Sequence, residues 1–200
     1  MTKRRRMNFR VDRRTGRMPA ARQVNSPNQD ARPGGVAPEL IVVHAISLPP
    51  GRFGGPWIDQ LFTNRLDPAL DPYFREIAGM KVSAHMLIRR DGGLVQYVPF
   101  HRRAWHAGPS CWQGRTACND FSVGIELEGT DTGPFHWRQY RRLAAVIRAL
   151  CRAYPSLSPA RLAGHSDIAP GRKTDPGPGF DWARLHRLLG PARYTAGDSS

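Results

Sequence analysis

This sequence lacks the features that mark membrane-spanning, disulfide-bonded and cysteine-rich zinc proteins. No apolar run approaches the ~18 residues of a membrane span. Its 200 residues include only three cysteines, Cys111, Cys118 and Cys151, without Cys-x-x-Cys spacing, so neither a disulfide framework nor a cysteine-rich zinc site is indicated. No hydrophobic stretch follows the basic N-terminal residues in the manner of an export signal. We therefore expect an unexported, cytoplasmic protein with reduced, partly buried thiols.

The positive charge is concentrated at the N-terminus. Residues 1–35 carry +8 of the formal charge of +14, contain few large apolar residues and end in Ala-Arg-Pro-Gly-Gly. Such a segment buries too little apolar surface to offset the entropy lost on ordering. We expect a basic, mostly disordered N-terminal extension over 1–35, a folded domain over 36–190 and a C-terminal tail over 191–200. The moderate charge of the folded part does not indicate nucleic acid, although the Arg-rich extension could bind anionic surfaces.

The folded part mixes strand-like and helix-like segments. A short apolar run predicts a strand over residues 38–44, and a further strand is predicted over 161–165. Over 121–129, Val123, Ile125 and Leu127 alternate with Gly124, Glu126 and Glu128, which is the pattern of a strand with one polar face. An Asp-Gly-Gly turn predicts a hairpin over 82–100. Apolar residues at i, i+3 and i+4 spacing predict a helix over 136–154, and shorter helices are predicted over 57–66 and after Asp181, a favourable N-cap. These elements predict an α/β (α+β) domain with a mixed sheet.

Two of the predicted strands end in histidine, at His44 and His165. Functional sites are commonly built where loops gather at sheet edges, and one more ligand would complete the three-residue set that catalytic zinc uses. Asp175 lies ten residues beyond His165 on a Pro- and Gly-rich loop that can fold back, whereas Asp167 suits a local turn. The chain has seven histidines, and any one histidine is more often a surface or hydrogen-bonded residue than a metal ligand, so spacing alone leaves the zinc site a hypothesis.

Two further side chains suit catalysis. Glu126 lies on a predicted strand rich in Val, Ile and Leu, and burial there would raise the pKa of its carboxyl toward the working pH of a general base. A solvent-facing carboxylate is the alternative, and Glu128 on the same face is a competitor. Lysine is scarce, with only three among 30 basic residues. Lys173 lies beside Arg172 and two residues before Asp175. Either this position requires a compact ammonium group, or the lysine is retained there by chance.

Five segments, in order along the chain, carry a specific resemblance. They are VVHAISLPPGRFGGPWID, VSAHMLIRRDGGLVQYVPF, RAWHAG, CNDFSVGIELEGTD and GHSDIAPGRKTDPGPGFDW. Together they resemble the zinc N-acetylmuramoyl-L-alanine amidases of the type 2 family, relatives of phage T7 lysozyme and the peptidoglycan recognition proteins. The resemblance covers about residues 38–190. It implies a mixed central sheet flanked by helices, with one zinc ion per chain in a groove.

The resemblance also implies roles for individual residues. His44, His165 and Asp175 match the family's zinc ligands, and Glu126 and Lys173 match its catalytic pair. The zinc would acidify a water molecule and polarise the scissile carbonyl, Glu126 would carry a proton to the leaving amine, and Lys173 would stabilise the oxyanion. The implied substrate is a (1,6-anhydro)muropeptide, cleaved between the lactyl group of muramic acid and L-alanine during cytoplasmic peptidoglycan recycling.

Other expectations concern the groove and its surroundings. The expected substrate-binding residues are Trp57, His85, Trp105 and His106, although Trp57 is equally compatible with a core position. Ala45 follows the first zinc histidine where family members often have Asn, which could remove a hydrogen bond at the site. We expect a monomer that needs no nucleic acid.

Two alternative functions stay open at the level of sequence. One is a module that binds peptidoglycan or muropeptides without cleaving them, which the presence of all three ligands and both catalytic candidates disfavours. The other is an exported, cell-wall lytic amidase, which the absence of a cell-wall-binding module after residue 190 disfavours.

Overall fold

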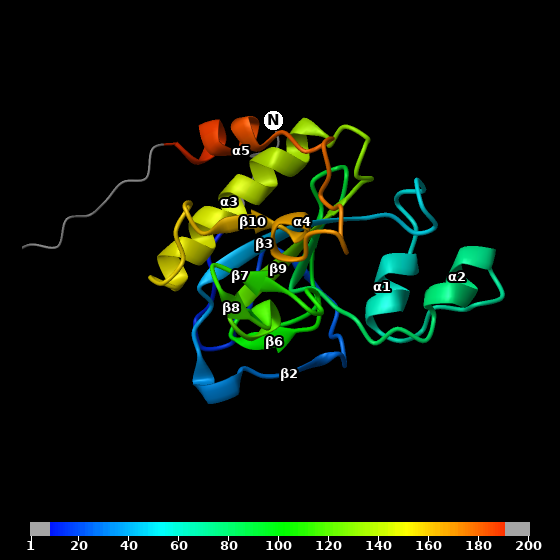
Figure 1. Cartoon of the computed structure of the whole chain (residues 1–200), viewed down its shortest axis with the longest axis horizontal. Coiled ribbons are helices and arrows are strands. Elements are labelled where there is room, and N and C mark those ends of the chain that lie inside the picture. Colours follow the sequence, from blue (N-terminus) through cyan, green and yellow to red (C-terminus); the bar gives the residue numbers. More distant parts are fainter. Residues whose placement is uncertain (1–8, 191–200) are drawn as a thin grey trace, which may run out of the picture.

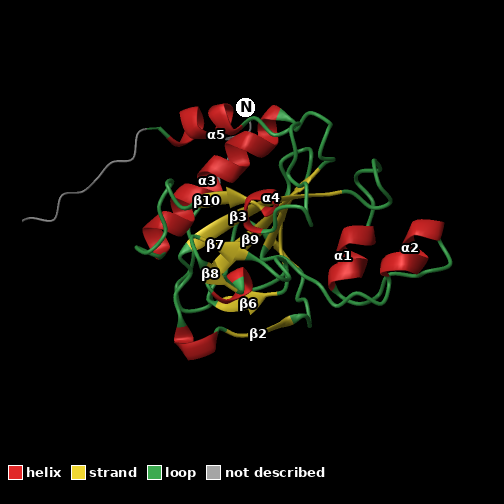
Figure 2. Cartoon of the chain, viewed as in Figure 1, coloured by secondary structure: helices red, strands yellow, loops and turns green. Residues whose placement is uncertain are grey.

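A mixed six-stranded sheet forms the centre of the computed structural model, which describes residues 9–190 (Figure 1 and Figure 2). The strands lie in the order β1 (Arg22–Gln23), β5 (Leu94–Gln96), β4 (Met86–Ile88), β9 (Ser122–Glu128), β3 (Leu40–Ile46) and β10 (Leu162–Gly164). Strands β4, β9, β3 and β10 are parallel neighbours, and β4 and β5 form an antiparallel hairpin. The predicted mixed sheet flanked by helices is confirmed.

The two central strands are buried along most of their length. All seven residues of β9 are buried, as are the first five of β3, which is typical of parallel strands covered on both faces. The predicted strand over 121–129 is therefore correct, but its expected polar face is not open to solvent. Glu126 and Glu128 are only 8% and 2% exposed.

One face of the sheet is covered by α3 (Trp137–Ala153) and α5 (Trp182–Leu189), which cross the top of Figure 1. Their apolar sides pack with Ile41, Val43 and Ile125 in the largest core cluster. Both helices begin as the sequence predicts. The N-cap His136 accepts the N–H of Arg138, and Asp181 Oδ1 accepts the N–H of Arg184 at 2.8 Å.

The opposite face is covered in two parts. Helices α1 (Trp57–Phe62) and α2 (Pro72–Ile77) pack over the β4–β5 side, and the sequence did not predict α2, although Asp71 before Pro72 is a favourable start. The other part comprises short elements over residues 102–120, namely β6 (Arg102–Ala104), β7 (Cys111–Trp112), β8 (Arg115–Thr116) and the 3₁₀ helix η2 (Cys118–Asp120). A cavity lies between the two parts, and α4 (His165–Ile168) follows β10 beside it.

The expectation of disorder over residues 1–35 is wrong for residues 9–35. This segment adds β1 to the central sheet, pairs β2 (Gln29–Ala31) with β6 and forms the short 3₁₀ helix η1 (Pro33–Gly35). Met18 is fully buried, and its N–H donates to Gln96 Oε1 at 2.8 Å. The amino-acid composition does not predict this order, because the order derives from backbone pairing with residues far along the chain. Residues 1–8 and the predicted tail over 191–200 lie outside the described residues.

Across residues 9–190, every helix falls short of the length and apolar character that crossing a membrane requires.

Candidate active site

Three strands deliver candidate site residues to the same edge of the sheet. His44 lies near the end of β3, directly opposite Glu126 on β9. Gly164, the last residue of β10, pairs with Val43, so His165 follows beside His44. Because β3, β9 and β10 are parallel, their carboxyl ends meet at this edge, where α/β proteins commonly bind ligands. The structure thus brings together residues that are far apart in the sequence.

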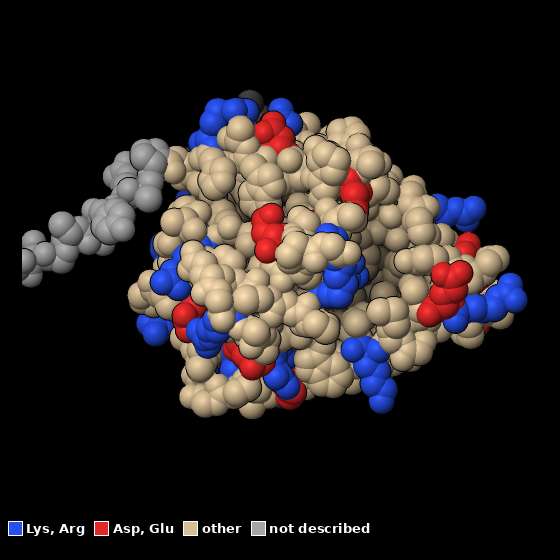
Figure 3. Space-filling view, viewed as in Figure 1, with Lys and Arg blue, Asp and Glu red and all other residues tan. Residues whose placement is uncertain are grey.

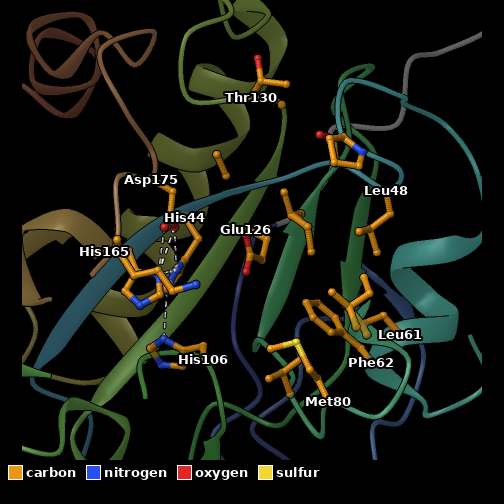
Figure 4. Close-up of a pocket in the computed structure, with 18 of the residues that line it drawn as sticks. His44, Leu48, Leu61, Phe62, Met80, His106, Glu126, Thr130, His165 and Asp175 are labelled. Atoms are coloured by element: carbon orange, nitrogen blue, oxygen red, sulfur yellow. Dashed lines mark hydrogen bonds and ion pairs between the residues drawn. The ribbon is translucent and has the colours of Figure 1, made fainter. Parts of the chain in front are cut away.

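His44, His165 and Asp175 form a compact cluster (Figure 4). Their ligand atoms all lie within 4.8 Å of one another. His44 Nδ1 is 3.0 Å from His165 Nδ1, and each of these nitrogens is 3.1 Å from the Asp175 carboxylate. Both histidines are buried and Asp175 is half-buried. The predicted trio therefore converges with its donor atoms facing a common point.

The remaining nitrogens of the two histidines point away from that common point. His44 Nε2 lies 2.9 Å from His106 Nδ1, and His165 Nε2 lies 3.2 Å from the carbonyl oxygen of Ala107. A histidine that donates from Nε2 keeps a lone pair on Nδ1. Two imidazole nitrogens and one carboxylate oxygen match the donor types of a catalytic zinc site, which leaves a further position open. These residues fit a zinc ion.

Burial and mutual contacts keep His44 and Asp175 in the protonation states that bind a cation. Burial lowers the pKa of His44 to about 4, although the contact with the Asp175 carboxylate opposes this shift. Burial alone would raise the pKa of Asp175, but its close contacts with His165 and His44 outweigh burial and hold that pKa below its ordinary value. At neutral pH His44 is therefore neutral and Asp175 is ionised, as metal ligands must be.

Glu126 has the environment of a general base, whereas its competitor Glu128 does not. Glu126 Oε2 is buried and has no hydrogen-bond partner among the described residues. Burial and the nearby Asp175 charge raise the pKa of Glu126 well above its ordinary value, and Lys173 opposes that shift. The carboxylate of Glu128 instead accepts from Arg89 Nη1 at 3.0 Å and from the Gly54 N–H at 2.7 Å. Glu128 is thus committed to a structural ion pair.

The cavity that contains Glu126 has a volume of about 420 Å³ and opens as a hollow beside the α1–α2 part of the molecule (Figure 3). Figure 4 shows the His44–His165–Asp175 cluster on one side of the cavity and Glu126 in the middle. On the other side lies an apolar wall of Leu48, Leu61, Phe62 and Met80. Lys173 also lines this cavity and is exposed. Sequence reasoning missed the apolar wall, because Leu61 and Phe62 have the ordinary pattern of a helix packed on a core and Leu48 and Met80 lie outside the helices and strands.

The structure separates the four expected substrate-binding residues into two pairs. Trp105 and His106 line the cavity. Trp57 does not, and its ring packs 6.0 Å from that of Phe74 in the core beneath α1 and α2.

His85 is fully buried outside the cavity lining. Its Nδ1 accepts the Gly124 N–H at 3.0 Å, and its Nε2 lies 3.0 Å from the carbonyl oxygen of Arg102. The surroundings of His85 therefore do not support the expectation that it contacts substrate, because both ring nitrogens are used by the backbone. Asp167 serves the local turn, as the sequence predicts, because its carboxylate accepts the Gly164 N–H at 2.6 Å.

Comparison with known proteins matches this chain to one family over most of its length. The model of the N-acetylmuramoyl-L-alanine amidase family matches residues 34–178. The chain is 62% identical over 174 residues to the 1,6-anhydro-N-acetylmuramyl-L-alanine amidase AmpD of Escherichia coli (strain K12), covering 87% of this chain and 94% of that protein.

Two solved structures extend the comparison. A crystal structure of a selenomethionine AmpD derivative is 60% identical and superposes with a TM-score of 0.86, covering 88% of this chain and 98% of that one. The amidase AmiD of E. coli, in complex with the substrate anhydro-N-acetylmuramic acid-L-Ala-D-γ-Glu-L-Lys, is 30% identical with a TM-score of 0.54, covering 76% of this chain and 57% of that one. The resemblance found in the sequence motifs is confirmed, and the chain belongs to the N-acetylmuramoyl-L-alanine amidase family of enzymes.

Proposed function

We propose that this enzyme is a zinc-dependent amidase that hydrolyses the bond between the lactyl group of 1,6-anhydro-N-acetylmuramic acid and L-alanine in muropeptides. The substrate class is supported by the name of the E. coli relative and by the anhydromuramyl peptide bound to AmiD. The observation that carries the proposal is the convergence of His44, His165 and Asp175 beside the unpartnered carboxylate oxygen of Glu126 in one cavity.

In this proposal His44 Nδ1, His165 Nδ1 and a carboxylate oxygen of Asp175 hold one Zn²⁺ ion. A zinc ion with such ligands keeps net positive charge, which polarises a carbonyl oxygen and acidifies water. The partners of the second ring nitrogens support this role, because a metal-binding histidine typically donates its other N–H to an acceptor that fixes its tautomer and ring orientation.

Glu126 acts as the proton carrier. Its unpartnered oxygen and raised pKa suit a group that accepts a proton from the attacking water. The same carboxyl then gives the proton to the nitrogen of L-alanine as the C–N bond breaks. The free peptide amine and the lactyl carboxylate are the products.

Lys173 stabilises the negative charge that develops on the former carbonyl oxygen. Lys173 lines the cavity, and although burial decides the pKa shifts of His44 and Glu126, its positive charge acts on both groups by favouring their deprotonated forms. Trp105, half-buried in the cavity wall, offers an apolar surface to the substrate. We also propose that the enzyme acts in the cytoplasm on muropeptides that are being recycled.

The test is product analysis by mass spectrometry with two substrates, an anhydromuropeptide and the same peptide on an intact muramyl end. We expect free peptide with an N-terminal L-alanine from the anhydromuropeptide, and loss of that product when zinc is removed by a chelator. An enzyme that binds the muropeptide and leaves it intact would contradict the proposed reaction. Equal rates on both substrates would leave the reaction standing but remove the preference for anhydro ends.

A further inference from the structure

His106 and Ala107, neighbours in the chain, contact the outer sides of the two candidate zinc histidines. His106 Nδ1 lies 2.9 Å from His44 Nε2, and the carbonyl oxygen of Ala107 lies 3.2 Å from His165 Nε2. Figure 4 shows His106 directly beside His44, on the side away from Asp175. A single short loop segment therefore supplies the outer partners of two ligands that come from different strands.

The contact between the two imidazoles fixes where the protons lie when His44 binds a metal. Only one of two facing ring nitrogens can carry the shared proton. A lone pair on His44 Nδ1 requires that proton to be on His44 Nε2, so His106 Nδ1 must accept it. Neutral His106 then carries its own proton on Nε2, which lies 3.1 Å from the acceptor oxygen Ser122 Oγ. The chain His44–His106–Ser122 thus admits one proton arrangement in the ligand-binding state.

The ring of His106 is held firmly in this place. The N–H groups of His106 and Ala107 both donate to Asn119 Oδ1, at 3.0 and 2.8 Å. The imidazole lies against β9 at Gly124, where a Cβ atom would come within 2.4 Å of the ring. A side chain at this position of β9 would therefore displace His106, which gives a physical reason for glycine in a strand that otherwise carries larger residues.

We propose that His106 is a positioning residue that holds His44 in the tautomer and ring orientation in which Nδ1 faces the zinc ion. This inference rests on the proposed zinc site and adds a residue that the resemblance had assigned only to substrate binding. A carbonyl or carboxylate commonly fills such a role and is worth about 10–100-fold in metal affinity. Here a second histidine fills it and passes the hydrogen-bond chain on to Ser122.

The test compares zinc dissociation constants, measured by competition with a chromophoric chelator, for the wild type and two variants. In His106→Leu the acceptor is lost, and we expect zinc binding to weaken by about 10–100-fold. In His106→Asn the amide oxygen replaces Nδ1 as acceptor, and we expect most of the affinity to return. His186→Leu, at an exposed position on α5, is the control and should bind zinc as the wild type does.

A second pair of variants tests the same inference independently, in case His106→Leu does not fold. Ser122→Ala removes the hydroxyl group that ends the hydrogen-bond chain His44–His106–Ser122. Gly124→Ala crowds the His106 ring without changing any hydrogen-bonding group. We expect both to weaken zinc binding, with the larger effect in Gly124→Ala. Wild-type zinc affinity in the His106→Leu and Gly124→Ala variants would overturn the inference, as would a raised KM with unchanged zinc affinity in His106→Leu. Failure of the wild type itself to bind zinc would instead contradict the proposed function.

Discussion

His44 and Glu126 lie directly opposite each other on the neighbouring parallel strands β3 and β9. Paired residues of parallel strands present their side chains to the same face of the sheet, and this face is the one opposite α3. One strand pair therefore places a metal-type ligand beside a buried carboxylate, without any contribution from loop geometry. The rigidity of this pair suits a site that must hold its groups at fixed separations.

Replacement of Glu126 by Gln should separate catalysis from metal binding. Gln has nearly the same shape but cannot take up a proton, so we expect turnover to fall by about 10²–10⁴-fold while one zinc per chain is retained. Glu128→Gln is the matched control, because Glu128 pairs with Arg89 and its loss should lower stability more than turnover. Unchanged turnover in Glu126→Gln would assign the proton transfer to another group.

The same substitution should change stability in a pH-dependent way. Burial raises the pKa of Glu126 well above 4.5, so the stability contributed by its proton is fully present below pH 4.5 and is lost as pH rises through the folded-state pKa. Gln has no such loss. We expect metal-free Glu126→Gln to gain on the wild type by about 1.4 kcal/mol per pH unit within that window. Urea unfolding between pH 4 and pH 7 measures this, and a difference independent of pH would contradict it.

Lys173 should be required for the rate of amide hydrolysis but not for zinc binding. Lys173→Met removes the positive charge beside the reacting carbonyl, and we expect a loss of about 10²–10³-fold in kcat with zinc content unchanged. Lys173→Arg keeps the charge in a planar, bulkier group, and we expect it to recover only part of the rate. Full activity in Lys173→Met, measured by peptide release, would exclude Lys173 from the reaction.

Arg32 should be a major source of stability in the N-terminal segment. It is 5% exposed and donates to the carbonyl oxygens of Phe100, Ser122 and Asp120. Arg32→Met would leave these acceptors unsatisfied, and we expect a loss of about 3 kcal/mol in the free energy of unfolding. Arg22→Met, which breaks only the pair between the exposed Arg22 side chain and Asp59, should cost at most about 1 kcal/mol. Equal effects in urea unfolding would contradict this role for Arg32.

The sequence predicted the elements whose signals are local. The i, i+3, i+4 pattern predicted α3, the Asp-Gly-Gly turn predicted the β4–β5 hairpin, and Asp181 predicted the start of α5. Order in residues 9–35 could not be read in this way. It depends on pairing of β1 with β5 and on acceptors for Arg32 that lie more than 60 residues along the chain.

The candidate site also combines features that the sequence motifs predict with features that depend on long-range contacts. The motif resemblance selected His44, His165, Asp175, Glu126 and Lys173, and the structure brings all five to one cavity. Spacing alone could not choose Glu126 over Glu128, because only the tertiary contact of Glu128 with Arg89 distinguishes two carboxylates on one strand face. The buried position of His85 was equally invisible, since its partners are backbone groups of Gly124 and Arg102.

The proposed function requires one zinc ion, held by His44, His165 and Asp175, for amide hydrolysis. Its most direct test measures zinc per chain by elemental analysis together with peptide release from an anhydromuropeptide, in the wild type and in His165→Ala. We predict about one zinc per wild-type chain, and loss of both zinc and activity in the variant, whose metal site would keep only two protein ligands. A zinc-free wild type that still cleaves the substrate, or a His165→Ala variant with full activity, would contradict this requirement.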